Sequence, residues 1–313
     1  MPMWYFSPEK NHIFMKGNND EKFYGKKFVA TALAAIIAVS SISATVFADF
    51  PYEADELFMS EDIQDGDYVQ ITAGDEGIYE PSSEYDEVIG MTDNEVRNLY
   101  DEFLADRPEV VSEDQEISQE VLEEFAQYAV ERGAIEDTAV QKAAITKALV
   151  RSEFKVVVTG GKAKGDTTAA ALLDHSLQDH PSNLSYDEYT TYAKQIKQST
   201  EFNTIVNNFK SYVTGRKLYQ RVESGSTTLN STEDLHLAYN KISYTIYGTK
   251  TNNVWTMRVV FNDTYDFEKV PWKNAMTSSA AVTAINNYAA YAQSLGAIVP
   301  YDIKVTVATT FTE

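Results

Sequence analysis

The stretch Ile242–Phe261 reads ISYTIYGTKTNNVWTMRVVF, and it decides the fold class. Ile242, Tyr244 and Ile246 alternate with polar residues, which is the period of a strand with one buried face. The same alternation returns after a polar, glycine-containing segment, at Trp255, Met257, Val259 and Phe261. We therefore predict a β-hairpin whose turn lies at 248–253.

Working outward, helical patterns precede this hairpin, and a helix and a strand follow it. Ala280–Leu295 has an amphipathic helical pattern closed by Gly296 and Pro300, and Ile303–Phe311 alternates as a last strand. Upstream we expect helices over 167–178, 189–197 and 202–213, with a short strand at 154–158. Helices followed by a mostly antiparallel sheet with one inserted helix predict an α+β fold.

The segment before residue 153 has a different character. Thr92 and Glu95 form a capping box that opens a helix, and two further helices are expected over 118–132 and 138–151. Residues 49–90 are acidic and turn-rich, with short apolar pieces such as Tyr68–Ile71, so we expect mainly loop or disorder there with one hairpin.

Charge divides the chain in the same way. Residues 49–150 hold 29 acidic and 5 basic side chains, whereas 151–313 hold 15 acidic and 16 basic. We predict a leader over 1–48, an acidic loop-rich segment over 49–90, an acidic helical segment over 91–152 and an α+β globular domain over 153–313. Because the whole chain carries a net charge of −21, a nucleic-acid partner is not expected.

The leader has the order of a removable signal peptide. Lys22, Lys26 and Lys27 precede an uncharged apolar run from Phe28 to about Val39, and Val46-Phe47-Ala48 offers a cleavage site. The apolar run is shorter than a bilayer span, so no stable membrane span is expected after cleavage. The chain has no Cys, which fits secreted proteins of Gram-positive bacteria. We expect a secreted, extracellular protein.

Familiar cofactor and metal motifs are incomplete. Gly160–Thr167 has the glycine spacing of a P-loop, but Asp166 stands where the phosphate-binding Lys belongs, so a flexible loop is expected. The Asp-rich run around Gly66 fails as a calcium loop, because Ile63 and Thr72 occupy ligand positions. No cofactor and no metal are predicted.

The chemistry-bearing cluster lies directly after the hairpin. Asp263 and Asp266 are placed to meet at a strand end with Tyr265 beside them. Paired carboxylates in a cleft raise one pKa and perform acid–base work, whereas in a polar turn they bond local amides. His175, flanked by Leu residues, has either a structural or a catalytic role. The candidate catalytic set is Asp263, Tyr265, Asp266 and His175.

Several segments carry a resemblance. The run Leu173–Gln178, the run Asp263–Phe267, and Asn286-Asn287-Tyr288 through Pro300-Tyr301 look like segments of secreted and polymorphic-toxin-like bacterial proteins. This resemblance covers roughly residues 165–313 and implies no settled activity.

Asp263-x-Tyr265-Asp266 is also similar to the Asp-x-Tyr-Asp motif of the M-type colicins, which cleave the lipid-linked peptidoglycan precursor. That family follows its motif with a His-Arg pair, where this chain has Pro271-Trp272-Lys273-Asn274. The resemblance therefore implies that His175 supplies the histidine from elsewhere in the fold.

Three functions remain open, and whether the protein is an enzyme stays undecided among them. The leading one is an interaction module whose Tyr- and Asn-rich C-terminal domain binds a cell-envelope component or a protein partner. The alternatives are a toxin-like effector acting on envelope material through Asp263, Tyr265 and Asp266, and a structural surface protein.

Overall fold

The computed structural model describes residues 68–75, 88–107, 118–269 and 280–313. The predicted leader and most of the acidic segment 49–90 lie outside the described residues. In chain order the elements are β1 (Tyr68–Ile71), α3 (Asp93–Asp106), α4 (Gln119–Glu131), α5 (Ala139–Lys164), α6 (Thr167–Ser176), β2 (Asn183–Tyr186), α7 (Thr191–Gln198), α8 (Thr200–Val213), β3 (Gln220–Thr228), α9 (Glu233–Tyr239), β4 (Lys241–Thr251), β5 (Val254–Tyr265), α10 (Ala280–Ser294) and β6 (Tyr301–Thr312).

The predicted α+β fold is confirmed. The strands form one six-stranded sheet in the order β1-β2-β6-β5-β4-β3. Strands β3 to β6 pair antiparallel, while β1 and β2 join the edge of β6 in parallel. Tyr68–Ile71 is a strand paired with Asn183–Tyr186, more than a hundred residues away. The range 49–90, in which a hairpin is expected, lies largely outside the described residues.

The predicted central hairpin is present: β4 and β5 pair antiparallel and are joined by a short turn. The turn itself is tighter than expected, because only Asn252 and Asn253 lie outside the strands and both have positive φ. Two successive residues with positive φ match the right-handed strand twist. Gly248 belongs to β4 rather than the turn, and there a Cβ would lie 2.3 Å from Cζ of Phe209 in α8.

The helices expected after 153 and the last strand are confirmed, with two corrections between 154 and 167. The strand predicted at 154–158 is wrong, because α5 continues unbroken to Lys164. Its β-branched residues favour strands locally, but Leu149, Phe154 and Val158 are buried on different sides of the helix, and this packing overrides the propensity. The loop expected at 160–167 is also wrong, since the helix ends only at Gly165, which has a left-handed φ of 103°.

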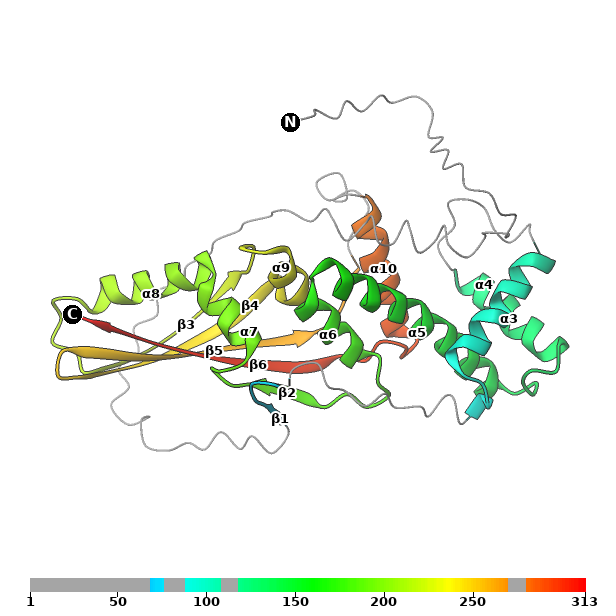
Figure 1. Cartoon of the computed structure of the whole chain (residues 1–313), viewed down its shortest axis with the longest axis horizontal. Helices are drawn as coiled ribbons and strands as arrows, with labels where there is room; N and C mark the ends of the chain where they lie inside the picture. Colours follow the sequence, from blue (N-terminus) through cyan, green and yellow to red (C-terminus); the bar gives the residue numbers. More distant parts are fainter. Residues whose placement is uncertain (1–67, 76–87, 108–117, 270–279) are drawn as a thin grey trace, which may run out of the picture.

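The helices cover one face of the sheet. Figure 1 shows α5 to α9 lying along that side, with α3 and α4 at one end and the β4–β5 turn with the C-terminus at the other. Alternate residues of β5 point toward the helices and are fully buried, namely Trp255, Met257, Val259 and Phe261. The opposite face of the same strands carries mostly Ser, Thr and Asn side chains.

The acidic helices join the same core as the sheet. The capping box of Thr92 and Glu95 is present at the start of α3, as predicted. Phe103 of α3 and Phe125 of α4 belong to the same cluster of buried side chains as the sheet. Helix α5 crosses the predicted boundary at 152/153 without a break, and Arg151 at that point is buried in an ion pair with Asp179, with Nη1 and Oδ1 2.5 Å apart.

Candidate functional site

The predicted cluster lies at the end of β5, as expected, but its members have different surroundings. The Tyr265 side chain is buried and packs against Tyr301, its partner on β6, with ring centroids 5.5 Å apart. Asp266 follows the strand and is exposed. Asp263 is half-buried and lies two residues before Tyr265, so its side chain shares the helix-covered side of β5 with Phe261 and Tyr265.

His175 is held as a buried structural side chain. It is 2 % exposed. Its Nδ1 lies 2.8 Å from the side-chain amide nitrogen of Gln178, and its Nε2 lies 2.8 Å from the carbonyl oxygen of Ser182. Since an amide N–H donates to Nδ1, the ring proton is assigned to Nε2, which donates to the carbonyl. Burial lowers the pKa of His175, which keeps this neutral form.

Tyr301 links the two buried members of the predicted set. The His175 ring meets the Tyr301 ring edge-on at 4.5 Å, and Tyr301 in turn packs on Tyr265. The fold thus brings His175 near the end of β5, as the sequence hypothesis required. It brings the ring into an aromatic core rather than beside the exposed carboxylate of Asp266.

Within the predicted catalytic set, Asp263 has a pKa near neutral pH. Burial, and then the nearby carboxylates of Asp266 and Asp302, raise the pKa of Asp263 to about 7, although the Thr264 amide donates to it. This carboxyl group therefore takes up and releases a proton near neutral pH. That is the acidity expected of a general acid–base, and also of a group whose ligand contacts depend on pH.

A shallow depression of about 450 Å³ lies on the sheet beside the end of β5, and Asp263 is one of the residues at its border. Its lining comes from β1, β3, β4, β5 and β6: Tyr68, Ser226, Lys241, Ile242, Ser243, Asn262, Asp263, Thr264 and Asp302. Most of these residues occupy the strand positions that alternate with the buried ones. The depression therefore lies on the face of the sheet away from the helices.

Strand register builds this lining from one row of cross-strand partners. Ser226 pairs with Ser243, Ser243 with Asn262, and Asn262 with Lys304. Beside this row, Thr264 pairs with Asp302, and its hydroxyl donates to the Asp302 carboxylate over 2.8 Å. Because the row runs perpendicular to the strands, at about 4.8 Å per strand, the depression is elongated on the order of 20 Å across the sheet.

Two cations and one aromatic ring complete the surroundings. The Nζ of Lys304 lies 4.2 Å from the ring centroid of Tyr68, so one face of that ring is already occupied. Lys241 is exposed, and no hydrogen bond or ion pair of its amine is found within the described residues. The depression thus offers an ammonium group, the carboxylate of Asp302, hydroxyls and an amide to a ligand.

Sequence reasoning singled out Asp263 but missed Tyr68, Lys241, Asn262, Thr264 and Asp302. The signal that identifies most of them is strand parity, since they alternate with apolar residues on strands that were already predicted. Parity alone does not give the pairing of β1 and β6 with distant strands. That pairing is what places Tyr68 and Asp302 at the same depression.

Comparison with known proteins does not extend this description, since no family model, curated protein or solved structure matches the chain. Within the described ranges, no group of three or more His, Asp or Glu side chains is arranged to hold a metal ion. Among those same residues, no helix combines the length and apolarity needed to cross a bilayer. The class of protein is therefore defined by its fold: an α+β domain with one helix-covered sheet face and one polar face carrying a depression.

Proposed function

We propose that this protein is an exported interaction module of the bacterial cell envelope, and that the depression on its polar sheet face binds a glycan chain. One observation carries the proposal: hydroxyl, amide, carboxylate and ammonium groups from several strands converge on one elongated depression. Such a mixed set of donors and acceptors matches the hydroxyl groups of a sugar, each of which donates and accepts. The elongated outline suits a chain rather than a single small molecule.

The rigidity of the lining supports this choice. Asn262, Thr264 and Ser243 stand on the central antiparallel strands, where each backbone is fixed by neighbours on both sides. Side chains held on strands bind with little loss of conformational freedom, which favours affinity at a shallow site. Tyr68 at the edge adds a side chain with an apolar body and a polar tip, which suits the apolar and polar faces of a sugar ring.

Export is part of the proposal and stands on the leader. The order of Lys22–Lys27, an apolar run and Val46-Phe47-Ala48 supports a signal peptide removed after Ala48. Sequencing the N-terminus of the protein recovered from the culture medium tests it. A chain beginning at Asp49 is expected, and retention of the whole chain inside cells contradicts export.

Glycan binding is tested with soluble glycan strands prepared from peptidoglycan, measured by isothermal titration calorimetry on the full chain. Replacing Asn262 and Thr264 together by Ala removes an amide and a hydroxyl from the centre of the depression, and we expect at least about tenfold weaker binding. The control is the Thr249→Ala/Thr256→Ala double variant, whose side chains share the same sheet face but lie outside the depression.

Equal weakening by the control pair would contradict the assignment of the site, and no heat of binding by the parent chain would contradict glycan recognition. Circular dichroism of both variants checks that the sheet is intact.

The second candidate is a toxin-like effector acting on envelope material through Asp263, Tyr265 and Asp266. The observation that favours it is the pKa of about 7 at Asp263, which suits a general acid–base. Under this function, Asp263→Asn abolishes turnover of the lipid-linked peptidoglycan precursor while leaving the fold unchanged. If the parent chain shows no turnover, the toxin-like effector is excluded and the interaction module remains. If glycan binding is absent as well, the structural surface protein remains.

A further inference from the structure

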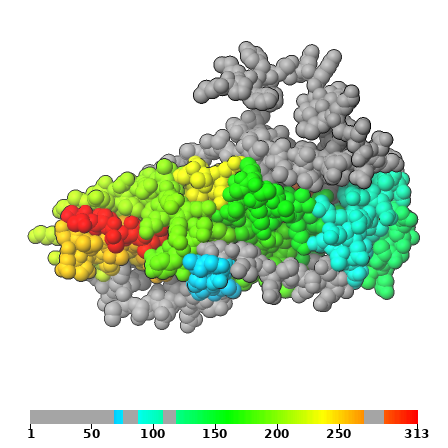
Figure 2. Space-filling model, in the orientation of Figure 1, coloured from blue at the N-terminus to red at the C-terminus, as the bar shows by residue number. Residues whose placement is uncertain are grey.

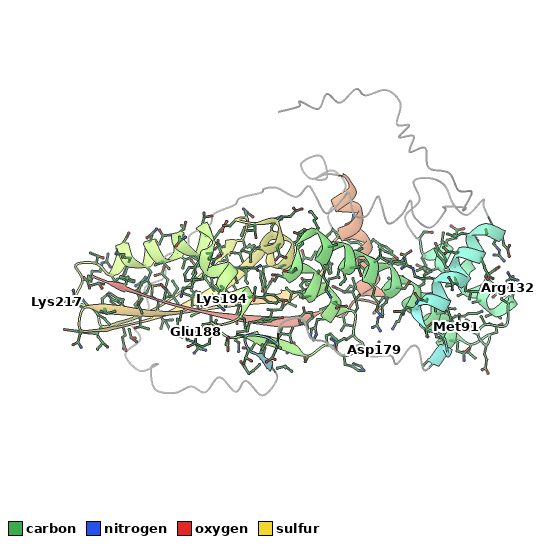
Figure 3. The ribbon with its side chains drawn as sticks, in the orientation of Figure 1. Met91, Arg132, Asp179, Glu188, Lys194 and Lys217 are labelled. Carbon is green, nitrogen blue, oxygen red and sulfur yellow. The ribbon has the colours of Figure 1, made fainter. Side chains whose placement is uncertain are left out.

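A second feature lies at the opposite end of the molecule from α3 and α4, where α8 ends and β3 begins. We call it the basic tip and define it by Lys210, Tyr212, Arg216, Lys217, Tyr219 and Arg221. Figure 3 labels Lys217 at this end, and Figure 2 shows segment 210–221 meeting the β4–β5 turn and the C-terminal strand there.

The tip departs from the charge of the whole protein. Between Glu201 and Glu223 the chain runs for 21 residues with four basic side chains and no acidic one, in a protein whose net charge is −21. Arg216 and Lys217 are exposed, and within the described residues neither has an ion pair. A concentrated positive patch on an acidic protein raises the local concentration of anions.

Two of the cations are fixed in space by a tyrosine ring. The guanidinium carbons of Arg216 and Arg221 lie 3.7 Å and 3.4 Å from the ring centroid of Tyr212. Two groups so close to one centroid occupy opposite faces of the ring, because on the same face they would overlap. The Tyr212 ring therefore holds two positive charges roughly 7 Å apart.

Neutralisation within the tip is incomplete. Arg221 shares its charge with Glu223, whose carboxylate oxygen is 2.9 Å from Nη2. Lys250 beside the tip is paired with Glu313. Arg216, Lys217 and Lys210 remain as surplus cations, and planar arginine forks bind phosphate oxygens through two hydrogen bonds.

We propose that the basic tip binds a phosphodiester-linked polyol polymer. Arg216 presents its whole guanidinium fork and Arg221 the edge that Glu223 leaves open, on the two faces of one aromatic ring. This spacing suits successive phosphates joined by a short polyol unit. Lys210 and Lys217, from the same segment of the chain, add to the positive surface.

The side chains at the tip disfavour two other anionic partners. Single-stranded nucleic acid binds by stacking bases on free aromatic faces, but both faces of Tyr212 are covered by arginines, which leaves only Tyr219, 76 % exposed. Membrane surfaces are bound through exposed Trp, Phe or Leu, whereas the exposed large hydrophobic residues at this end are Tyr and Val: Tyr212, Tyr219, Val222 and Val254.

The test uses the full chain and a fluorescently labelled poly(glycerol phosphate), with binding followed by fluorescence anisotropy at several salt concentrations. For Arg216→Gln/Lys217→Gln we expect about tenfold weaker binding and a slope of log K against log salt that is smaller by about 1 to 2. The matched control is Lys194→Gln/Lys197→Gln, which removes the same charge from α7, away from the tip (Figure 3). It is expected to bind like the parent chain.

A second variant separates geometry from charge. Tyr212→Leu leaves every charge in place but removes the ring that holds the two arginines, and about threefold to tenfold weaker binding is expected. Binding unaffected by this variant would overturn the role of the arginine pair.

Three results would overturn the proposal as a whole. The first is equal weakening by the α7 control. The second is tighter binding to a DNA oligonucleotide of equal charge than to the polymer. The third is loss of binding to phosphatidylglycerol vesicles in Arg216→Gln/Lys217→Gln with polymer binding unchanged. Since the depression and the tip share no residue, glycan binding and polymer binding fail separately.

Discussion

At the scale of single residues, Asp263 shows how a strand end changes the chemistry of an ordinary carboxyl group. The group is half-buried on the sheet, and the carboxylates of Asp266 and Asp302 lie close enough to oppose its ionisation. In a polar turn fully open to water the same side chain would stay ionised at neutral pH. Because of its position on β5, Asp263 therefore changes its protonation state near physiological pH.

The acidity of Asp263 predicts how stability depends on pH. Its pKa rises from 3.8 to about 7 on folding, so between pH 4 and pH 7 the folded chain binds the proton more tightly, and stability falls as pH rises through this window. Glu153 contributes with the same sign, because burial raises its pKa to about 7 despite a hydrogen bond from Tyr288. Asp263→Asn removes the contribution of Asp263 and leaves that of Glu153.

As the pH rises from 4.5 to 7.5, we therefore expect the free energy of unfolding to fall less in Asp263→Asn than in the parent chain. After discounting for the partial exposure of the group, the difference is roughly 2 kcal/mol. Urea unfolding at several pH values measures it. An equal loss of stability in both chains would show that Asp263 ionises normally in the fold.

At the scale of elements, α8 approaches the central hairpin closely at one glycine. Phe209 of α8 lies against the backbone of Gly248 in β4 and packs edge-on against Trp255, with centroids 5.5 Å apart. Glycine here weakens the strand locally but lets the helix reach the sheet. The same contact fixes the end of α8, and with it the basic tip that follows.

This contact predicts a paired effect. Gly248→Ala places a methyl group 2.3 Å from the Phe209 ring, so the helix or the ring must move, and we expect destabilisation by about 2–3 kcal/mol. Phe209→Leu alone creates a cavity, but in the double variant the smaller side chain makes room for the methyl group.

The double variant is therefore expected to be more stable than the sum of the two single effects, by about 1 kcal/mol or more. Chemical denaturation of the four chains measures this coupling. Strict additivity would indicate that α8 does not press on β4 as described.

At the scale of the whole molecule, α5 joins the acidic helices to the sheet. It packs with α3, α4 and α6, and its Phe154 stacks on Tyr288 of α10 with ring centroids 5.2 Å apart. Arg151 near the middle pairs with Asp179 and donates to the carbonyl of Ala297 over 3.0 Å. A buried charge of this kind is strongly destabilising when its partner is lost.

Limited proteolysis with trypsin follows from this arrangement. Arg132, half-exposed at the end of α4, is the expected first cleavage site within the described residues, while Arg151 and Lys155 within α5 are protected. Mass spectrometry of the products identifies the sites. A resistant product beginning at Ser152 or Val156 would show instead that the chain divides at the predicted boundary.

The amino-acid sequence by itself determined the helices with clear caps, the central hairpin, the last strand and the α+β class. These depend on periodicity and capping, which act between residues close in the chain. Sequence reasoning went wrong at 154–158, where β-branched residues lie in a helix because their neighbours in space are helices. It also missed β2, β3 and α9, whose short or Ser- and Thr-rich sequences carry little periodic signal.

Only the tertiary structure decided the sites. One depression is lined by Tyr68, Asp302 and Lys241 because distant strands pair in one register. One ring is flanked by Arg216 and Arg221 because α8 ends beside β3. The sequence pointed to Asp263 and His175, but burial separated an ionisable carboxyl group from a neutral structural histidine. Local pattern fixes which element a residue joins, whereas long-range packing fixes its neighbours, its exposure to water and therefore its charge.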